Sequence, residues 1–376
     1  MLIREIVDII MKKAINSLNL NDVAYKVTSF HNYIDVSDNK VQKARKNLEM
    51  YSFNPKTSCI TSNMVSPEVD VHIIVPVYNT EKFIRQCIDS VVNAEKRYTY
   101  RLTVINDGST DGTAKILEEY KSNPDVEIIT QENKGFSGAR NRGLKHIVGR
   151  YISFLDSDDF VDWKGIEKML DIAFANDYDI VQGSYAVVSE NGLNEKRVIR
   201  YKNEEVDLAN PRINGGPCAK VIKSQYFSNI CFPEKYWFED SIVNSILVPM
   251  IKSAYTVEDI VYYNRSRDGS ISRTARSQKK SVDSFWITEQ LMHDRERLGI
   301  DKNITYYEYI LRMVMLTYER TKFQSKECKE AIFVLQADLL NKKFKGFSTK
   351  ISLMKPLELA IRNNDYGYYK AFCQWK

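Results

Sequence analysis

Cysteines and long apolar runs are scarce in this sequence. Six cysteines are scattered between Cys59 and Cys373 with no CxxC or other metal-ligand spacing, and no secretory hydrophobic segment precedes them. No apolar stretch approaches the roughly 18 residues needed to span a bilayer. These absences argue against a disulfide-rich secreted protein and against a membrane-spanning one. We expect a cytoplasmic protein whose membrane contact, if any, is peripheral and at the inner face.

Two nucleotide-binding signatures and a strong charge imbalance are also missing. Neither GxGxxG nor GxxxxGK occurs, which argues against hydride-transfer cofactors and P-loop triphosphate chemistry. The net charge of +5 is small for 376 residues, and the basic residues are widely spread. Nucleic-acid binding is therefore not expected.

The chain divides into three stretches by pattern. Its hydrophobic fraction of 43% is that of an ordinary globular protein. Residues 1–66 predict a helical lead-in, with an apolar stripe from Ile3 to Met11, followed by a polar linker. Residues 67–276 alternate strands and helices, and residues 277–376 show a helical pattern.

Short apolar runs alternate with amphipathic helices from Val71 onward. The predicted elements are the strand 71–75, a helix through 83–92, the strand 102–105, the helix 113–120 and the strand 126–129. Successive βαβ units predict an α/β fold with a doubly wound, mostly parallel sheet. Ligands of such sheets bind beyond the carboxyl ends of the strands. The stretch 262–276 is basic and rich in small residues, which predicts a mobile loop.

An acidic cluster follows the apolar run 151–155. It reads Asp156-Ser157-Asp158-Asp159. Three like charges repel unless a cation neutralises them, and hard oxygen ligands of this kind suit Mg²⁺ or Mn²⁺. An Asp-rich loop can also be solvated and cap the next helix. Taken alone, the cluster leaves both interpretations open.

Four motifs together carry a resemblance to a known family. They are Val75–Asn79, Asn106–Thr113, Asn133–Gly143 and Asp156–Asp159. Their order and spacing are similar to the successive signatures of family 2 glycosyltransferases with the GT-A fold. The resemblance covers about 69–162 and extends more loosely to Arg273. It implies a GT-A domain over 67–276, with a nucleotide half to 162 and an acceptor half from 163, between helical additions.

The resemblance also implies which residues hold the donor. That donor would be a UDP-sugar, with Mn²⁺ or Mg²⁺ bridging its diphosphate to Asp158. Asp156 would lie near the ribose and the donor sugar, and Asp159 is expected to cap the helix beginning near Asp162. Further donor-binding positions would be Pro76, Val77, Tyr78, Asn79, Asp107, Arg140, Asn141 and Ser157. Three arginines could close over the diphosphate once the donor binds, or they could be solvated surface residues: Arg265, Arg267 and Arg273.

On the acceptor side, Asp240 matches the catalytic base of the family. It would take a proton from the acceptor hydroxyl that attacks the anomeric carbon, which inverts the configuration. Glu239 and Trp237 would lie at the acceptor site. Glu239 and Asp240 could instead have a structural role at the start of a helix, because acidic residues favour a helix N-terminus. The only histidine beyond Asp240 is His293, so the metal-binding histidine of some relatives has no counterpart near the base.

These observations predict a metal-dependent inverting glycosyltransferase acting on a glycan, a lipid-linked glycan or a glycoprotein. A sugar-nucleotide nucleotidyltransferase would need a Gly-rich triphosphate loop, which 76–79 does not provide. A non-catalytic glycan-binding module derived from a transferase need not keep both the metal ligand and the base. The terminal helices could contact a membrane surface or a second copy of the chain.

Overall fold

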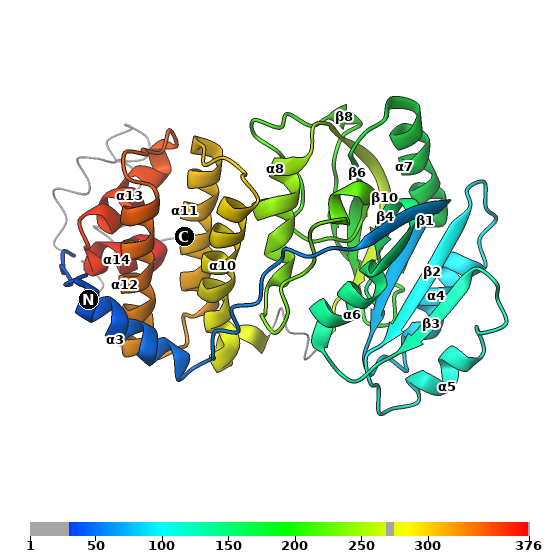
Figure 1. Cartoon of the computed structure of the whole chain (residues 1–376), viewed down its shortest axis with the longest axis horizontal. Helices are drawn as coiled ribbons and strands as arrows, with labels where there is room; N and C mark the ends of the chain where they lie inside the picture. Colours follow the sequence, from blue (N-terminus) through cyan, green and yellow to red (C-terminus); the bar gives the residue numbers. More distant parts are fainter. Residues whose placement is uncertain (1–29, 268–273, 375–376) are drawn as a thin grey trace. The chain divides into compact units, whose positions relative to one another are not determined.

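The computed structural model describes residues 30–267 and 274–374. The chain forms two compact units (Figure 1). An α/β unit comprises Pro55–Ser270 with Gln290–Ile300, and a helical unit comprises Met1–Asn54, Ile271–Glu289 and Asp301–Lys376. The predicted stripe from Ile3 to Met11 lies outside the described residues. The predicted domain limits at 66 and 276 stay a prediction.

A ten-stranded mixed sheet forms the α/β unit. The strand order is β3-β2-β1-β4-β9-β6-β10-β5, with β7 on β6 and β8 on β10. The first four of these are mutually parallel, as expected for successive βαβ units, whereas β9 runs antiparallel between β4 and β6. The strands are β1 (Met64–Val77), β2 (Tyr100–Asn106), β3 (Val126–Thr130), β4 (His146–Phe154), β5 (Phe160–Val161), β6 (Ile180–Val188), β7 (Glu195–Ile199), β8 (Glu204–Glu205), β9 (Lys220–Lys223) and β10 (Ala254–Arg265).

Helices cover both faces of this sheet. Residues of α4 (Ile84–Val92) and α7 (Trp163–Asn176) share one apolar core with Ile73 and Val75 of β1. On the other face α6 (Gly135–Leu144) approaches β1 so closely that a Cβ at Gly143 would lie 2.7 Å from Ile74 Cγ2. Glycine permits this approach. Since α6 carries Arg140, its packing on the sheet fixes a site residue.

The predicted loop over 262–276 is wrong in its first part. Tyr262 and Tyr263 lie in β10 and pair with Val161 and Phe160 of β5. Aromatic residues suit a pleated, half-buried surface. The sequence analysis did not identify this pairing because β5 lies about 100 positions away in the chain.

Shorter elements complete the unit: α5 (Thr113–Glu118), η1 (Ser224–Phe227), η2 (Glu239–Ser241), the π-helical turn η3 (Val243–Leu247) and α8 (Val248–Met250).

The described part of the helical unit confirms the helical character predicted for the lead-in and for residues 277–376. Its α3 buries Val41, Ala44 and Leu48, and Arg45 donates to Glu289 at 2.6 Å.

Among the described residues, no helix combines the length and apolar character needed to cross a membrane. The elements are α3 (Asp38–Glu49), η4 (Ala275–Ser277), η5 (Lys279–Val282), α10 (Asp283–Arg297, shared with the α/β unit), α11 (Ile304–Arg320), α12 (Lys326–Lys343), η6 (Ser352–Met354), α13 (Lys355–Arg362) and α14 (Tyr366–Gln374).

Candidate active site

The three carboxylates of the loop after β4 have three different environments. Asp156 accepts a hydrogen bond from Arg140 Nη2 at 2.8 Å. Asp158 is paired with the Arg267 guanidinium. Asp159 is buried, and its carboxylate accepts a hydrogen bond from β10. The cluster is therefore not a uniform acidic surface.

Asp159 fastens this loop to β10. Its carboxylate accepts hydrogen bonds from the Tyr262 hydroxyl at 2.6 Å, from Asn264 Nδ2 at 3.0 Å and from the Arg265 backbone N–H at 2.7 Å. Burial raises the pKa of Asp159, and the two neighbouring aspartates raise it further. Asp159 is thus an anchor of the loop, held by residues that the sequence analysis did not select. Tyr262 and Asn264 stand two positions apart, a strand spacing that could have indicated them.

The helix cap of α7 is Asp162. Its side chain accepts a hydrogen bond from the Lys164 backbone N–H at 3.1 Å. The expectation that Asp159 caps this helix is wrong, because the Asp159 carboxylate is occupied by donors of β10.

Asp158 has the surroundings that a cation would stabilise. Burial and the negative charge of Asp156 raise the pKa of Asp158, so a positive charge beside it is favourable. In this structure the guanidinium of Arg267 supplies that charge, and it also lies 5.4 Å from the Phe83 ring centroid. Mg²⁺ at phosphate sites binds one or two carboxylates plus phosphate oxygens. Asp158 with Asp156 beside it fits that ligand set. Over residues 30–267 and 274–374 no group of three or more His, Cys, Asp or Glu side chains could hold a metal.

Arg140 joins the acidic loop to the predicted acceptor side. Its Nη2 donates to Asp156 Oδ1 at 2.8 Å, and its Nη1 donates to Glu239 Oε1 at 2.7 Å. The guanidinium is buried and lies 5.2 Å from the Phe232 ring centroid. Burial alone would lower the pKa of Arg140, but the carboxylates of Asp156 and Glu239 raise it. One permanent cation therefore holds two carboxylates from opposite halves of the α/β unit.

The predicted base Asp240 directly follows Glu239 in η2. Phe238 precedes the pair with a φ of 66°, in the left-handed region. Because this conformation is costly for a residue with a side chain, the surrounding structure must hold the turn in place. The Arg140–Glu239 hydrogen bond is one contact that does so.

A buried lysine lies close enough to Asp240 to interact with it electrostatically. Lys220, the first residue of β9, is fully buried, and its Nζ donates to the Gly216 carbonyl at 2.6 Å and to the Cys218 carbonyl at 3.3 Å. Burial lowers the pKa of Lys220 to about 7, while Cys218 and Asp240 oppose that shift. The sequence analysis missed this residue, since a lysine in an apolar run carries no motif.

Asp107 organises the start of α6. Its carboxylate accepts hydrogen bonds from Gln131 Nε2 at 2.7 Å and from the backbone N–H groups of Lys134 at 2.9 Å and Gly135 at 2.7 Å. The side chain is buried. Asp107 thereby orients the helix that carries Arg140. Its predicted contact with the nucleoside stays a prediction.

The first loop is split between strand and turn. Pro76 and Val77 belong to β1, with buried side chains, whereas Tyr78 is exposed. Asn79 has a φ of 51°, and its Oδ1 accepts a hydrogen bond from the Thr110 backbone N–H at 2.8 Å. The turn after β1 is thus tied to the turn after β2.

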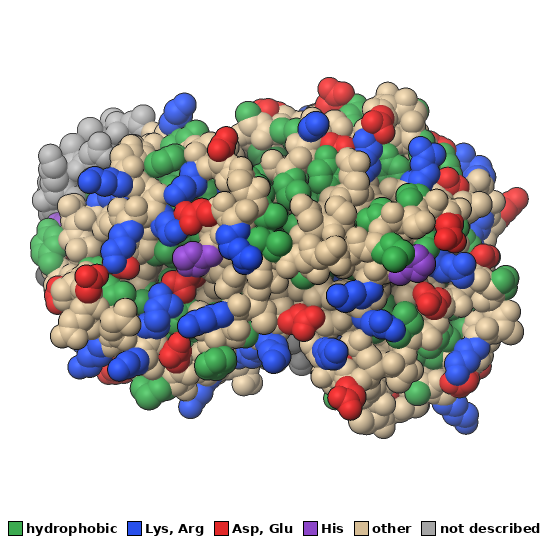
Figure 2. Space-filling view, viewed as in Figure 1, with side chains coloured by type: hydrophobic (Ala, Val, Ile, Leu, Met, Phe, Trp, Pro, Cys, Tyr) green, Lys and Arg blue, Asp and Glu red, His purple; other side chains and the backbone are tan. Residues whose placement is uncertain are grey.

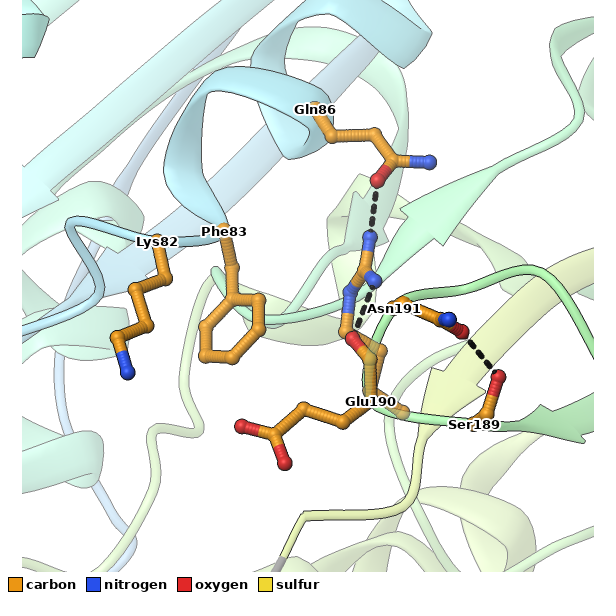
Figure 3. A pocket seen from close by; sticks show the side chains of 7 residues that line it. Lys82, Phe83, Gln86, Ser189, Glu190 and Asn191 are labelled. Carbon is orange, nitrogen blue, oxygen red and sulfur yellow. Dashed lines mark hydrogen bonds between the residues drawn. The ribbon is translucent and has the colours of Figure 1, made fainter.

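Arg265 makes several contacts within the α/β unit, and its predicted closure over the diphosphate stays a prediction. Its Nη1 donates to the Glu190 carbonyl at 2.8 Å, and its other terminal nitrogen contacts Gln86 Oε1. Its guanidinium lies 5.3 Å from the Phe83 ring centroid and 5.0 Å from the Phe160 ring centroid. Arg265 lines a cavity of ≈ 540 Å³, and Figure 3 shows Phe83, Gln86 and Glu190 among the other side chains that line it. The lining residues are Lys82, Phe83, Gln86, Ser189, Glu190, Asn191 and Arg265.

The remaining predicted positions are spread around this centre. Ser157 is buried in the acidic loop. The side chain of Asn141 donates to the Phe232 carbonyl and accepts from the Phe232 N–H, both at 2.8 Å, which ties α6 to the chain before η2. The Trp237 ring packs edge-on at 6.3 Å from the Phe238 ring. Arg273 lies outside the described residues.

The arrangement of the sheet defines the class of protein. The structure of S. aureus TarS 1–349 in complex with UDP-GlcNAc matches 81% of this chain and 90% of that chain, with a TM-score of 0.65 and 20% identity. At this identity the likeness concerns the fold alone. The predicted α/β, GT-A fold is confirmed.

The family follows from the sequence matches. Residues 72–234 match the model described as Glycosyl transferase family 2. An uncharacterized glycosyltransferase of Haemophilus influenzae is 30% identical over 251 residues, which cover 63% of this chain and 93% of that protein. The chain belongs to glycosyl transferase family 2, as the four motifs indicated.

Other relatives are longer than this chain. The minor teichoic acid biosynthesis protein GgaB of Bacillus subtilis is 31% identical over 242 residues, covering 60% of this chain but only 26% of GgaB. The chain thus spans about a third or less of the length of GgaB and of glycosyltransferase GlyA of Streptococcus pneumoniae, which it also matches.

Proposed function

We propose that the chain is a metal-dependent inverting glycosyltransferase that moves a sugar from a UDP-sugar to a hydroxyl of a glycan, a lipid-linked glycan or a glycoprotein. The observation that carries this proposal is the Arg140 bridge from Asp156 to Glu239. It fixes the acidic donor loop and the acid pair containing Asp240 around one cation. The UDP-GlcNAc of the TarS complex supports a UDP-sugar donor, and membership in family 2 argues against a nucleotidyltransferase.

In the proposed reaction Asp240 is the general base. The acceptor oxygen forms a bond to the anomeric carbon as the bond from that carbon to the phosphate oxygen breaks. The acceptor proton passes to the Asp240 carboxylate, and the electron pair of the broken bond leaves with UDP. Attack from the face opposite the leaving group gives an inverted product. Glu239 and Trp237 would contact the acceptor.

On the donor side Asp158 would hold Mn²⁺ or Mg²⁺, with Asp156 beside it. When bound, such an ion offsets negative charge on the departing diphosphate. Pro76, Val77, Tyr78, Asn79, Asp107 and Ser157 would frame the nucleotide and sugar. Arg267 would exchange its pairing with Asp158 for the diphosphate. The cytoplasm remains the proposed location.

A screen of UDP-sugars tests this proposal. We expect one UDP-sugar with Mn²⁺ to raise the melting temperature and to be hydrolysed slowly, with the released sugar having the inverted anomeric configuration by NMR. Asp158→Ala should abolish both metal-dependent effects. Glu118→Ala, which removes an exposed carboxylate on α5, is the matched control and should change neither.

Two results would contradict the proposal. Metal-dependent UDP binding that survives in Asp158→Ala would remove the metal role. Donor binding without hydrolysis, and without transfer to any glycan acceptor, would instead favour the glycan-binding module.

A further inference from the structure

Three segments of the helical unit meet at the end where α12 begins. The Tyr51 hydroxyl, just after α3, lies 2.8 Å from Ser325 Oγ, just before α12. Gln324 Nε2 donates to the Gln278 carbonyl at 3.0 Å, which attaches the turn between η4 and η5 to the same place. The end of α3, the residues 276–280 and the turn between α11 and α12 therefore form one continuous surface.

Three large apolar side chains are exposed on this surface. The exposed fractions are 73% for Met50, 74% for Phe53 and 68% for Phe323. A scattered exposed apolar residue is ordinary, but several on adjoining segments indicate an interaction site. None of them is used by the candidate active site, which belongs to the α/β unit.

Lysines are interleaved with these side chains. Lys322 Nζ lies 5.2 Å from the Phe323 ring centroid, and Lys279 and Lys326 are exposed nearby. Carboxylates partly neutralise the surface, because Arg276 and Lys322 share Glu319 and Lys326 pairs with Glu330 at 3.7 Å. Figure 2 shows hydrophobic and basic side chains next to one another over the helical unit.

The charge of the chain is also divided between the two units. Within the described residues the helical unit contains 20 Lys and Arg against 13 Asp and Glu, a net charge of +7. The α/β unit contains 28 against 32, a net charge of −4. The small net charge of the whole chain thus conceals a basic helical unit, which an anionic partner would attract.

We propose that this surface docks on an anionic membrane. It is defined by Met50, Phe53, Lys279, Lys322, Phe323 and Lys326, and we name it the Phe323 face. Exposed aromatic and Met side chains would enter the interface between headgroups and acyl chains while the lysines contact anionic headgroups, and stable surface binding needs both signals. A protein partner fits less well, because the cores of protein interfaces are depleted in lysine. The inference stands independently of the proposed transfer reaction.

Vesicle sedimentation tests the proposal with the full chain. We expect cosedimentation with vesicles of 30% phosphatidylglycerol in phosphatidylcholine, little with phosphatidylcholine alone, and weaker binding at high salt. The double variants Phe53→Ser/Phe323→Ser and Lys322→Glu/Lys326→Glu should each bind on the order of tenfold more weakly. Circular dichroism and the melting temperature verify that both variants are folded.

Matched controls come from the segment after the far end of α12. Leu353→Ser removes a side chain that is 56% exposed, and Lys345→Glu/Lys350→Glu makes the same charge change. The 18 residues of α12 separate them from the Phe323 face by about 27 Å. Controls that weaken binding equally, equal binding to both vesicle types, or no binding to anionic vesicles would overturn the proposal. So would self-association in solution that Phe53→Ser/Phe323→Ser abolishes.

Discussion

Arg140 Nη1 lies 2.7 Å from Glu239 Oε1, although the two residues are 99 positions apart in the chain. The same guanidinium donates to Asp156. Arg140 belongs to α6, whose start is held by Asp107 and whose last turn packs on β1 through Gly143. The position of the predicted base beside Glu239 therefore depends on the same helix that faces the acidic loop.

Replacing Arg140 should destabilise the folded chain. Arg140→Met leaves the carboxylates of Asp156 and Glu239 without their shared buried cation, and removing one member of a buried ionic network costs about 3–5 kcal/mol. We expect the free energy of unfolding in urea to fall by that amount. Arg142→Met removes an exposed arginine from the same helix and should change it by less than about 0.5 kcal/mol. Similar values for both variants would contradict the bridging role.

Arg267 should compete with metal for Asp158. In the absence of nucleotide, Mn²⁺ must displace the Arg267 guanidinium from the Asp158 carboxylate. We expect Arg267→Gln to bind Mn²⁺ about tenfold more tightly by calorimetry, which corresponds to about 1.4 kcal/mol. Lys82→Gln, which neutralises a cation that lines the cavity together with Phe83, should leave this affinity unchanged. Unchanged affinity in Arg267→Gln would place the ion elsewhere.

Lys220 should make stability depend on pH. Its pKa in the folded chain is about 7, against about 10.4 in an unfolded chain. Between these values the unfolded state binds the additional proton, so the free energy of unfolding rises with pH by up to about 1.4 kcal/mol per unit from this group. Lys220→Met should lack that contribution. Urea unfolding at pH 7, 8 and 9 should therefore show the wild type gaining stability relative to the variant. Parallel pH profiles would show that the lysine stays protonated.

Much of the fold follows from local pattern. The β-branched run from Val71 predicts β1 because its residues are buried on both faces, and the polar turns beyond the first strands meet at one edge of the parallel sheet. Two of the four motifs, Val75–Asn79 and Asn106–Thr113, combine a strand end with the turn after it. Asn133–Gly143 lies mostly in α6, and Asp156–Asp159 lies in the loop after β4.

The contacts that join distant segments could not be predicted in this way. The insertion of β9 between β4 and β6, and the capture of Asp159 by Tyr262 and Asn264, depend on pairing across tens to about 100 residues. Local periodicity carries no information on such partners. The buried side chain of Lys220 was missed because its two acceptors are backbone carbonyls, which no side-chain motif marks.

The central claim is that Asp240 acts as the base without holding the donor, and Asp240→Asn tests it most directly. Once the donor is identified, transfer and UDP binding with Mn²⁺ can be measured on the same preparation. We predict that transfer falls by about 10²–10⁴-fold while the Kd for UDP stays within about twofold of the wild type. Asp207→Asn, on an exposed turn of the same unit, should preserve both. Transfer within tenfold of the wild type, or a large loss of UDP affinity, would contradict the assignment.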